Sequence, residues 1–528
     1  MNDLSSAQLG FPRLRPTRGD TPPANPLRLA VDLSHLQSRG ASGGVKPFVL
    51  EYLRGLAMLE GDNLVFVFLT CTASHSEVRQ LARAQDELVC VRDNGGEGPA
   101  ALGNWRGGET FLPHPPLNLL VQLRADVFYS PLISAEFACQ GVPTLATVVD
   151  VLHRDYPATL SPESNRHRES SFQKLVRVSA KFQCISHYTA GQMTRHYKIP
   201  ADQMFCSHVI IHHRFNPVDS ARRREAADVP YFLYPANCWP HKNHETLLVA
   251  YRLYRRQHAG TPWRLVLTGH ESDAMHQLLE TAGHLGVREH ITFHGHLPEK
   301  EFAGLWRDAG ALVFPSLHEG FGIPLIEAMH FGIPILSSEM GSLPEVGGDA
   351  ALYADPLSPV AWAGAMLKIA THPELRAALV ARGRRRLGEF SLAAELKEFR
   401  DEIRSLAGKP GRRWNHGLHP DGWIEGIAVF GLPASSGNAR LEVRVAAGPA
   451  SRRVRLYRGL TPLGGFDVPA GIAVEHFLEI QPDGQPLVIE VPDADHLDSA
   501  DHRRHGVLLA AVNLESAGQR LNLMEEAP

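Results

Sequence analysis

The N-terminal part of the chain alternates between short apolar runs and amphipathic segments. One amphipathic segment, at 48–59, follows the first apolar run and has the spacing of a helix that buries one face. The apolar runs have the length of buried strands and lie at 27–33, 64–69, 126–129, 143–149 and 182–185. This alternation predicts an α/β unit in which helices cover both faces of a parallel sheet.

A second series of the same kind begins near Tyr231. Its apolar runs lie at 231–234, 264–268, 291–293, 311–314 and 333–337. Helical segments separate these runs at about 243–257, 273–285, 299–308 and 324–331. The sequence therefore predicts a second doubly wound unit, joined to the first around 215–229. Ligands of such sheets bind beyond the carboxyl ends of the strands, so we expect the site in a cleft between the units.

Both ends of the chain differ from this pattern. Residues 1–26 hold five prolines and little periodic hydrophobicity, which predicts a flexible leader. From about residue 408 the sequence GKPGRRWNHGLHPDG has the composition of a linker. Short alternating runs punctuated by turn residues follow it, and they predict a β-sandwich.

Composition narrows the class of protein. The chain has 53 basic and 57 acidic residues, a net charge of −4, with 44% hydrophobic and 21% charged residues. These values argue against a disordered chain and against a general nucleic-acid binder. The sequence contains no run of apolar residues long enough for a membrane-spanning helix and no signal peptide, which favours a cytoplasmic protein.

Metal-ligating residue types are plentiful but are not spaced as ligands. The six cysteines form no C-x-x-C pair, and the 28 histidines include no H-E-x-x-H motif. Histidine pairs three residues apart, at 241/244 and 502/505, have no third candidate ligand close by in the sequence. The pattern indicates neither a zinc site nor a disulfide framework, and it suits a reducing compartment.

The most informative stretch is ALVFPSLHEGFGIPLIEAMHFGIPIL, at 311–336. An apolar strand leads into a loop, and Pro324 stands where a helix can begin. Gly320 and Gly322 allow a ligand to approach the backbone beside the free N–H groups of that helix, which suits a phosphate. Glu319 and Glu327 are suited to accept hydrogen bonds from sugar hydroxyls. Their spacing alone is equally consistent with a solvated loop residue and a residue that favours the helix.

The segment E-G-F-G-I-P-L-I-E resembles the E-x7-E motif of the retaining glycosyltransferases of family 4, which have the GT-B fold. Four further segments support the resemblance in order: YFLYPANCWPHKNHETLLVAY, WRLVLTGH, ITFHGHLPEKEFAGLWRDAGALVFPS and GSLPEVGGDAALYADP. The resemblance implies two Rossmann-like, doubly wound domains that face a cleft, with an all-β sandwich after them. The predicted boundaries are a leader at 1–26, an acceptor domain at 27–220, a donor domain at 221–407, a linker at 408–420 and the sandwich at 421–528.

The resemblance also implies roles for residues of the donor domain. Glu319 would contact hydroxyls of the transferred sugar, and Glu327 would contact the ribose of the nucleotide. The backbone that lines the sugar and the diphosphate would be that of Gly320, Phe321 and Gly322.

Lys242 matches the phosphate-binding lysine of the family, and an ammonium group can neutralise charge on a leaving diphosphate. The family usually has an arginine five residues earlier, where this chain has Asn237. Asparagine forms hydrogen bonds but carries no charge, so either another basic residue compensates or the diphosphate is held less strongly. The form PAN-x-WPHKN looks like one found among mannosyl- and rhamnosyltransferases of surface polysaccharide assembly.

In the first unit, the resemblance places Gly43 and Gly44 against the donor phosphates, although such a loop is also an ordinary flexible turn. The segment ATVVDVLHRDYP resembles the histidine-aspartate loop of the family, with Val149 in place of the histidine. Asp150 is retained, and His153 is expected either near the acceptor or in a structural role.

The implied reaction is the retaining transfer of a hexose from a nucleoside diphosphate sugar to a hydroxyl of a growing bacterial surface glycan, of O-antigen or exopolysaccharide type. GDP-mannose is the first candidate donor, with UDP- and dTDP-sugars as alternatives, and no metal or organic cofactor is expected. The acceptor would be a glycan or lipid-linked glycan, with peripheral association at the inner membrane and oligomerisation left open. The competing hypotheses are a non-enzymatic glycan-binding or scaffolding protein on the same fold, and an epimerase or phosphorylase.

Overall fold

The computed structural model describes residues 26–36, 44–93, 109–112, 119–139, 142–215, 230–409, 415–418, 422–432, 437–459, 461–482, 485–492, 494–496 and 504–524. Gly43, nearly all of the predicted leader, most of the stretch that joins the two α/β units and most of the predicted linker lie outside these residues.

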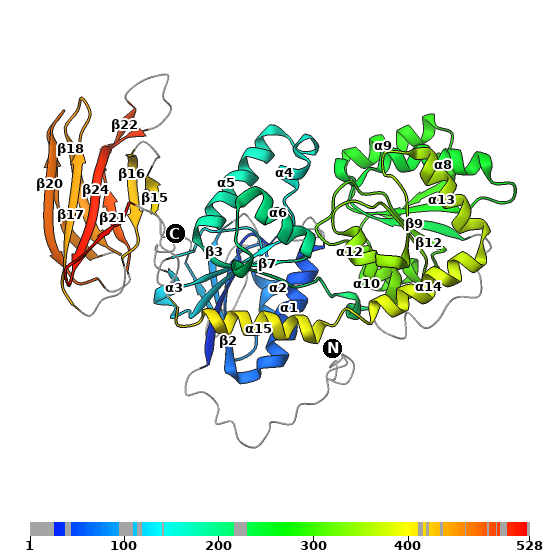
Figure 1. Ribbon diagram of the computed structural model, residues 1–528, viewed down its shortest axis with the longest axis horizontal. Coiled ribbons are helices and arrows are strands. Elements are labelled where there is room, and N and C mark those ends of the chain that lie inside the picture. The colour runs from blue at the N-terminus through cyan, green and yellow to red at the C-terminus, as the bar shows by residue number, and fades with distance from the viewer. Residues whose placement is uncertain are drawn as a thin grey trace, which may run out of the picture.

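The first unit is built on a parallel sheet with the strand order β4-β3-β2-β1-β5-β6-β7-β8 within the described residues (Figure 1). The strands are β1 (Leu27–Leu33), β2 (Leu64–Cys71), β3 (Glu87–Arg92), β4 (Glu109–Phe111), β5 (Val127–Ser130), β6 (Thr144–Val148), β7 (Ser179–Cys184) and β8 (Met204–Cys206). All eight residues of β2 are buried, as expected of a strand covered by helices on both faces. The sequence pattern missed β3, β4 and β8; β4 and β8 are three-residue strands, too short to stand out as apolar runs.

The helices of the first unit are α1 (Val45–Glu60), α2 (His75–Arg79), α3 (Leu119–Gln122), α4 (Leu152–Asp155), α5 (Pro162–Val178) and α6 (His187–Tyr197). Two of them begin at a serine that caps the first turn: Ser161 accepts a hydrogen bond from the backbone N–H of Ser164, and Ser186 accepts one from that of Thr189. Capping places the start of α6 directly after the carboxyl end of β7, at the edge of the sheet that faces the second unit.

The second unit repeats the plan with the strand order β11-β10-β9-β12-β13-β14, all parallel. Its strands are β9 (Tyr231–Pro235), β10 (Arg264–Thr268), β11 (Ile291–Phe293), β12 (Ala311–Phe314), β13 (Ile335–Ser337) and β14 (Ala351–Tyr353). Its helices are α8 (His244–Gln257), α9 (Asp273–His284), α10 (Glu299–Asp308), α11 (Ile323–Phe331), α12 (Leu343–Gly347), α13 (Pro359–Thr371) and α14 (Pro373–Leu387). The pattern predicted every strand except β14.

A last helix, α15 (Leu392–Leu406), returns from the second unit to the first (Figure 1). The ring of Phe399 lies 5.0 Å from that of Tyr129 in β5 and 6.0 Å from that of Tyr52 in α1, centroid to centroid. Ion pairs join Lys181 to Glu402 and Arg404 to Glu60. The range 221–407 therefore ends in a helix that packs on the first unit, and this contact helps to hold the two units together.

The C-terminal module is antiparallel and all-β, with the strand order β19-β18-β21-β16-β24-β17-β20. Its strands are β15 (Asn415–Leu418), β16 (Trp423–Phe430), β17 (Ala439–Ala446), β18 (Arg452–Arg458), β19 (Thr461–Val468), β20 (Ala473–Ile480), β21 (Leu487–Glu490), β22 (Asp495–His496), β23 (Arg504–His505), β24 (Val507–Ser516) and β25 (Gln519–Asn522). Alternate residues of β17, Leu441, Val443 and Val445, are fully buried in a core that the module forms by itself. No described helix contributes a residue to this core, which side chains of the module itself form.

The two doubly wound units and the antiparallel module confirm the fold class predicted from the pattern. No helix in the described ranges is long and apolar enough to cross a membrane.

Candidate active site

A cleft of about 1650 Å³ opens between the two α/β units. The first unit contributes the start of α1 and the loops that follow β5 and β6, and the second unit contributes the loops that follow β9, β10 and β12. These loops are at the carboxyl ends of parallel strands, where doubly wound sheets bind their ligands. Asp150 of the first unit and Lys242, Asn237 and Glu319 of the second line the cleft.

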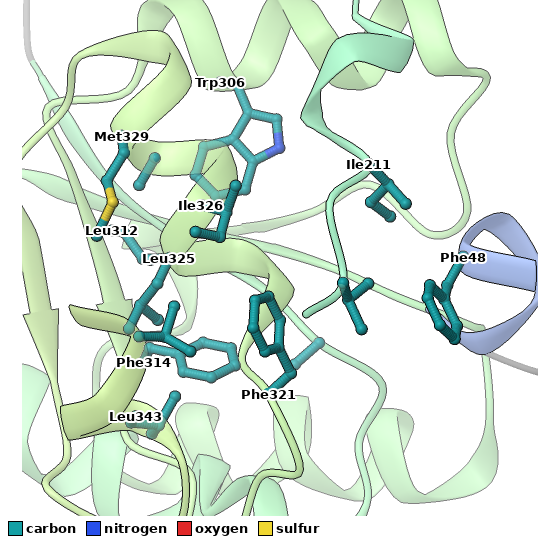
Figure 2. Packing of buried hydrophobic residues seen from close by; sticks show 14 of the residues in the cluster. Phe48, Ile211, Trp306, Leu312, Phe314, Phe321, Leu325, Ile326, Met329 and Leu343 are labelled. Carbon is teal, nitrogen blue, oxygen red and sulfur yellow. The ribbon is translucent and has the colours of Figure 1, made fainter. Parts of the chain in front are cut away.

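The loop after β12 leads into α11 as the sequence predicts. Gly322 precedes the helix with φ of 96°, a conformation that glycine adopts without strain, and Pro324 lies in the first turn. The side chains of Leu325, Ile326 and Met329 are buried beneath the helix, as Figure 2 shows. This packing holds the N-terminus of α11 at the cleft, where its free N–H groups favour an anion.

Gly320 lies against the first unit. A side chain there would place its Cβ 1.7 Å from the carbonyl oxygen of Val149, so only glycine fits. Ser186 Oγ donates a 2.7 Å hydrogen bond to the carbonyl of Gly320, and Thr189 Oγ1 donates a weaker one at 3.3 Å. The glycine therefore serves the contact between the units, a requirement that the motif alone does not reveal.

Glu319 and Lys242 form an ion pair in the cleft. Lys242 Nζ is 2.6 Å from Glu319 Oε1, and the two side chains are 14% and 12% exposed respectively. Lys242 ends a 3-10 turn, Pro240–Lys242, and its carbonyl accepts a 2.6 Å hydrogen bond from the Tyr234 hydroxyl. Both charges are thus held at the cleft surface by local backbone structure, and each is open to a ligand.

Glu327, the second carboxylate of the motif, is buried and pairs with Arg214. Arg214 donates to Glu327 Oε1 from a 3-10 turn, His212–Arg214, in the segment that follows β8 of the first unit. Burial raises the pKa of Glu327, and the charge of Arg214 opposes that shift. The sequence analysis missed Arg214, because no spacing connects it with a residue more than a hundred positions away.

Asn237 does not supply the charge that the family arginine carries. Its Oδ1 accepts a 2.8 Å hydrogen bond from the backbone N–H of His270, at the mouth of β9 and β10. The nearby His241 does not compensate, since burial, reinforced by the charge of Lys242, lowers its pKa to about 4. Several cationic side chains of the first unit line the same cleft, among them Lys46 and Arg168.

Of the site residues predicted in the first unit, Gly44 and Asp150 line the cleft. Gly44 faces the second unit, since a Cβ on it would lie 2.6 Å from Ile323 Cδ1. Asp150 lines the cleft; its Oδ1 accepts a 2.9 Å hydrogen bond from the N–H of Leu152 and lies 3.5 Å from Arg168 Nη1.

His153 lies outside the residues that line the cleft. It is 2% exposed, its ring centroid is 4.6 Å from that of Phe172, and its Nε2 lies 2.6 Å from the hydroxyl of Tyr197. Burial lowers its pKa. The structure therefore favours the structural role over a position near the acceptor, because α4 turns this side chain into the core.

His318 is a cleft residue that the sequence analysis did not single out. It precedes Glu319, is 3% exposed, and lies between the rings of Tyr156 and Tyr188, at 5.8 and 5.9 Å. Its Nδ1 is 3.6 Å from Asp155 Oδ2. Its position directly before Glu319 in the motif could have drawn attention to it. The tyrosines beside it belong to the first unit, however, and only the folded structure brings them together with His318.

Comparison with known proteins bears on the second unit most directly. Residues 217–386 match the family model described as Glycosyl transferases group 1. The chain is 30% identical over 236 residues to O-antigen chain mannosyltransferase B of Escherichia coli, a match that covers 43% of this chain and 61% of the relative. It is 26% identical over 208 residues to O-antigen chain mannosyltransferase RfbU of Salmonella typhimurium, covering 38% of this chain and 56% of the relative. The matches thus span less than two thirds of these curated relatives.

Solved structures resemble the two α/β units together. HepE of Anabaena, solved in complex with UDP and glucose, superposes with a TM-score of 0.54 at 15% identity, over 72% of this chain and 100% of its own. WaaG, described as a glycosyltransferase involved in lipopolysaccharide biosynthesis, superposes with a TM-score of 0.52 at 16% identity, over 71% of this chain and 99% of its own. At such identities the likeness shows the fold alone. The two units therefore have the GT-B fold, and residues 217–386 match the model of the glycosyl transferases group 1 family.

Proposed function

We propose that this protein is a retaining glycosyltransferase that moves a hexose from a nucleoside diphosphate sugar to a hydroxyl of a growing bacterial surface glycan. The observation that carries the proposal is the ion pair of Lys242 and Glu319 at the N-terminus of α11, inside the cleft between the units. The ammonium group and the helix N-terminus suit the anionic diphosphate, and the carboxylate in the same cleft suits the hydroxyls of the sugar. The group 1 family match and the O-antigen relatives support the same conclusion.

When the donor binds, its diphosphate would replace Glu319 as the partner of Lys242. Its oxygens would bind the ammonium group and the N–H groups at residues 320–322, where the helix end favours negative charge. Glu319, released from its ion pair, would then accept hydrogen bonds from hydroxyls of the transferred sugar. Exchange of this kind is feasible because both side chains reach the cleft surface.

In the transfer, the bond between the anomeric carbon and the diphosphate oxygen breaks and the bond to the acceptor oxygen forms on the same face of the sugar. The acceptor proton passes to the departing phosphate oxygen, so charge balances without a protein nucleophile. Lys242 and the helix N-terminus stabilise the negative charge that develops on the leaving group. Asp150, with Arg168 beside it on the opposite wall, is placed to orient the acceptor or the sugar.

Glu327 would bind the ribose. Arg214 donates to Oε1, which leaves Oε2 to accept from a ribose hydroxyl. The charge of Arg214 opposes the rise in the pKa of Glu327 that burial causes, and so favours the ionised carboxylate, which is the stronger acceptor. GDP-mannose is the first donor to test because curated relatives are O-antigen mannosyltransferases, with UDP- and dTDP-sugars next. We place the reaction in the cytoplasm, on a glycan or lipid-linked glycan, without a metal or organic cofactor in the chemistry.

The test is release of nucleoside diphosphate from a panel of nucleotide sugars in the presence of glycan acceptors, comparing wild type with Glu319→Gln. The substitution keeps the size of the side chain and removes its charge. Turnover is expected to fall by about a hundredfold or more, while calorimetric binding of the free nucleoside diphosphate is retained. Glu280→Gln, at an exposed position of α9, is the matched control.

Unchanged turnover in Glu319→Gln would refute the assignment of the site. If wild-type protein releases no nucleoside diphosphate from any donor yet binds glycan, the chain is a glycan-binding protein and the proposed activity is wrong.

A further inference from the structure

Four side chains with metal-ligating atoms meet where the two α/β units touch. Three belong to the first unit: His187 begins α6, Cys206 ends β8, and His208 follows two residues later. The fourth, Glu345, belongs to α12 of the second unit. One ligand atom of each, a ring nitrogen, the thiol sulfur or a carboxylate oxygen, lies within 4.8 Å of all the others.

We propose that these four residues form a structural zinc site that links the two units. Cys206 Sγ lies 3.8 Å from His208 Nε2, and that nitrogen lies 3.2 Å from Glu345 Oε1. Around a tetrahedral Zn²⁺, with Zn–S near 2.3 Å and Zn–N or Zn–O near 2.1 Å, the corresponding separations are about 3.6 and 3.4 Å. These two separations are thus within about 0.2 Å of those that zinc requires, and the remaining ones, all within 4.8 Å, would have to shorten when the ion binds.

The ring of His208 is oriented for metal binding by a carboxylate outside the cluster. His208 Nδ1 lies 2.9 Å from Glu395 Oε1, and the backbone N–H of His208 donates to Glu395 Oε2 at 2.9 Å. A histidine that donates through Nδ1 presents the lone pair of Nε2, which here faces Cys206 and Glu345. A carboxylate behind a ligating histidine is the usual support of a zinc ligand.

Glu345 is held in place by the start of α6. Its two carboxylate oxygens accept the backbone N–H groups of His187 and Tyr188, at 2.8 and 2.9 Å. These bonds bring His187 beside the cluster, with its ring centroid 5.8 Å from that of His208. The His187 side chain is exposed, so it is able to rotate onto the ion and provides a path of entry.

The donor set favours zinc over the other common divalent cations. Zinc binds thiolate, imidazole and carboxylate ligands, whereas Mg²⁺ and Ca²⁺ prefer oxygen alone and would not be matched by a thiolate and two imidazoles. Four protein ligands also leave no position for a reacting water, which is the mark of a structural site.

The proposed zinc site is next to the loop at 320–322, which would bind the diphosphate in the proposed reaction. The ring of His208 is 5.8 Å from that of Phe321, whose backbone is part of the loop at 320–322. A metal that ties three ligands of the first unit to one of the second would therefore hold this loop against the first unit. It takes no part in the proposed transfer reaction, and its existence does not depend on that reaction.

The same contacts also describe an alternative without metal, a protonated His208 held between Glu345 and Glu395. In that arrangement neither Cys206 nor His187 is a metal ligand, although Cys206 Sγ still contacts His208 Nε2. Substitution of these two residues therefore separates the alternatives, and both positions are open enough for small replacements, since Cys206 is half-buried and His187 is exposed.

The experiment measures metal in the purified full chain by mass spectrometry, before and after incubation with Zn²⁺ and gel filtration. About one zinc per chain is expected for wild type and for Cys238→Ser, a half-buried cysteine outside the cluster. Cys206→Ser and His187→Ala are expected to bind zinc at least tenfold more weakly. Co²⁺ in place of Zn²⁺ should give thiolate-to-cobalt absorption in wild type that Cys206→Ser lacks.

A second measurement is the melting temperature with Zn²⁺ and with EDTA. Binding to the folded chain should raise it in wild type and not in the double variant Cys206→Ser/His187→Ala. If wild type holds no more zinc than the double variant, or if its melting temperature is the same in both conditions, the proposal is wrong and His208 is a cation shared by two glutamates. Neither readout depends on turnover, so failure here leaves the proposed glycosyltransferase activity untouched.

Discussion

The two glutamates of the E-x7-E motif are paired with cations in different surroundings. Glu319 meets Lys242 at the surface of the cleft, and both residues belong to the second unit. Glu327 meets Arg214 in a deeper part of the same cleft, where the carboxylate is only 3% exposed, and its partner comes from the segment that follows β8 of the first unit. One pair is open to exchange with a ligand, whereas the other joins two parts of the fold.

Burial is the reason for the difference. The Glu319 side chain is 12% exposed and that of Glu327 is 3% exposed, so loss of its partner should cost less for Glu319. A buried carboxylate has no water to replace the partner, and an unpaired charge there is expensive. The comparison assigns Glu319 mainly to function, and it assigns Glu327 to stability as well as to ligand binding.

The largest effect is expected for Arg214→Gln. The variant leaves the carboxylate of Glu327 buried without a countercharge, which costs about 3–5 kcal/mol of unfolding free energy. Urea unfolding measures the loss. The double variant Arg214→Gln/Glu327→Gln has no charge to bury and is expected to recover most of it; a double variant as unstable as the single one would contradict the explanation.

The loss of unfolding free energy in Arg214→Gln should depend on pH. Burial already raises the pKa of Glu327 above its ordinary value of 4.5, and without Arg214 the pKa rises further. A carboxyl with a raised pKa in the folded state stabilises the protein while it is protonated, and that contribution disappears as pH rises through the folded pKa. The deficit of Arg214→Gln relative to wild type should therefore be smaller at pH 5 than at pH 8. An equal deficit at both pH values would exclude ionisation of Glu327 as the cause.

The next effect is expected for Lys242→Met. Loss of the ammonium group removes stabilisation of the leaving diphosphate, so turnover should fall by about a hundredfold, equivalent to about 2.7 kcal/mol. The melting temperature should fall less than in Arg214→Gln, because Glu319 lines the cleft and its side chain is more exposed than that of Glu327. Parallel measurement of nucleoside diphosphate release and thermal unfolding checks both parts. If Lys242→Met lost as much stability as Arg214→Gln, the claim that the two ion pairs differ in their contribution to stability would be wrong.

The smallest effect is expected for Ser186→Ala. This serine caps α6 and donates to the carbonyl of Gly320, the residue after Glu319. Loss of a cap and of a buried hydrogen bond costs about 1–2 kcal/mol. Urea unfolding of Ser186→Ala beside Ser405→Ala, an exposed serine of α15, provides the comparison. A stability equal to wild type would show that this contact does not anchor the loop.

Local patterns predicted a large part of the fold. Most strands of both α/β units, and the loop-to-helix transition from Pro315 to Gly332, follow from apolar runs, proline and glycine at particular positions. The patterns failed for the three-residue strands β4, β8 and β14 and also for the six-residue β3, although they found β11 and β13, which are equally short. They also left the place of His153 open, because three residues of separation from Asp150 do not determine on which side of the backbone a side chain lies.

The sequence by itself determined two doubly wound units, an antiparallel module, and a phosphate-binding type of loop flanked by two glutamates, because all of these depend on residues that are close in the chain. The tertiary structure alone decided the partners of those residues. Arg214 reaches Glu327, and Cys206 and His208 reach Glu345, only after two sheets have folded and docked. Local spacing determines backbone conformation. Side chains from distant segments meet only where packing brings them together, and the spacing of residues in the sequence does not show which of them will meet.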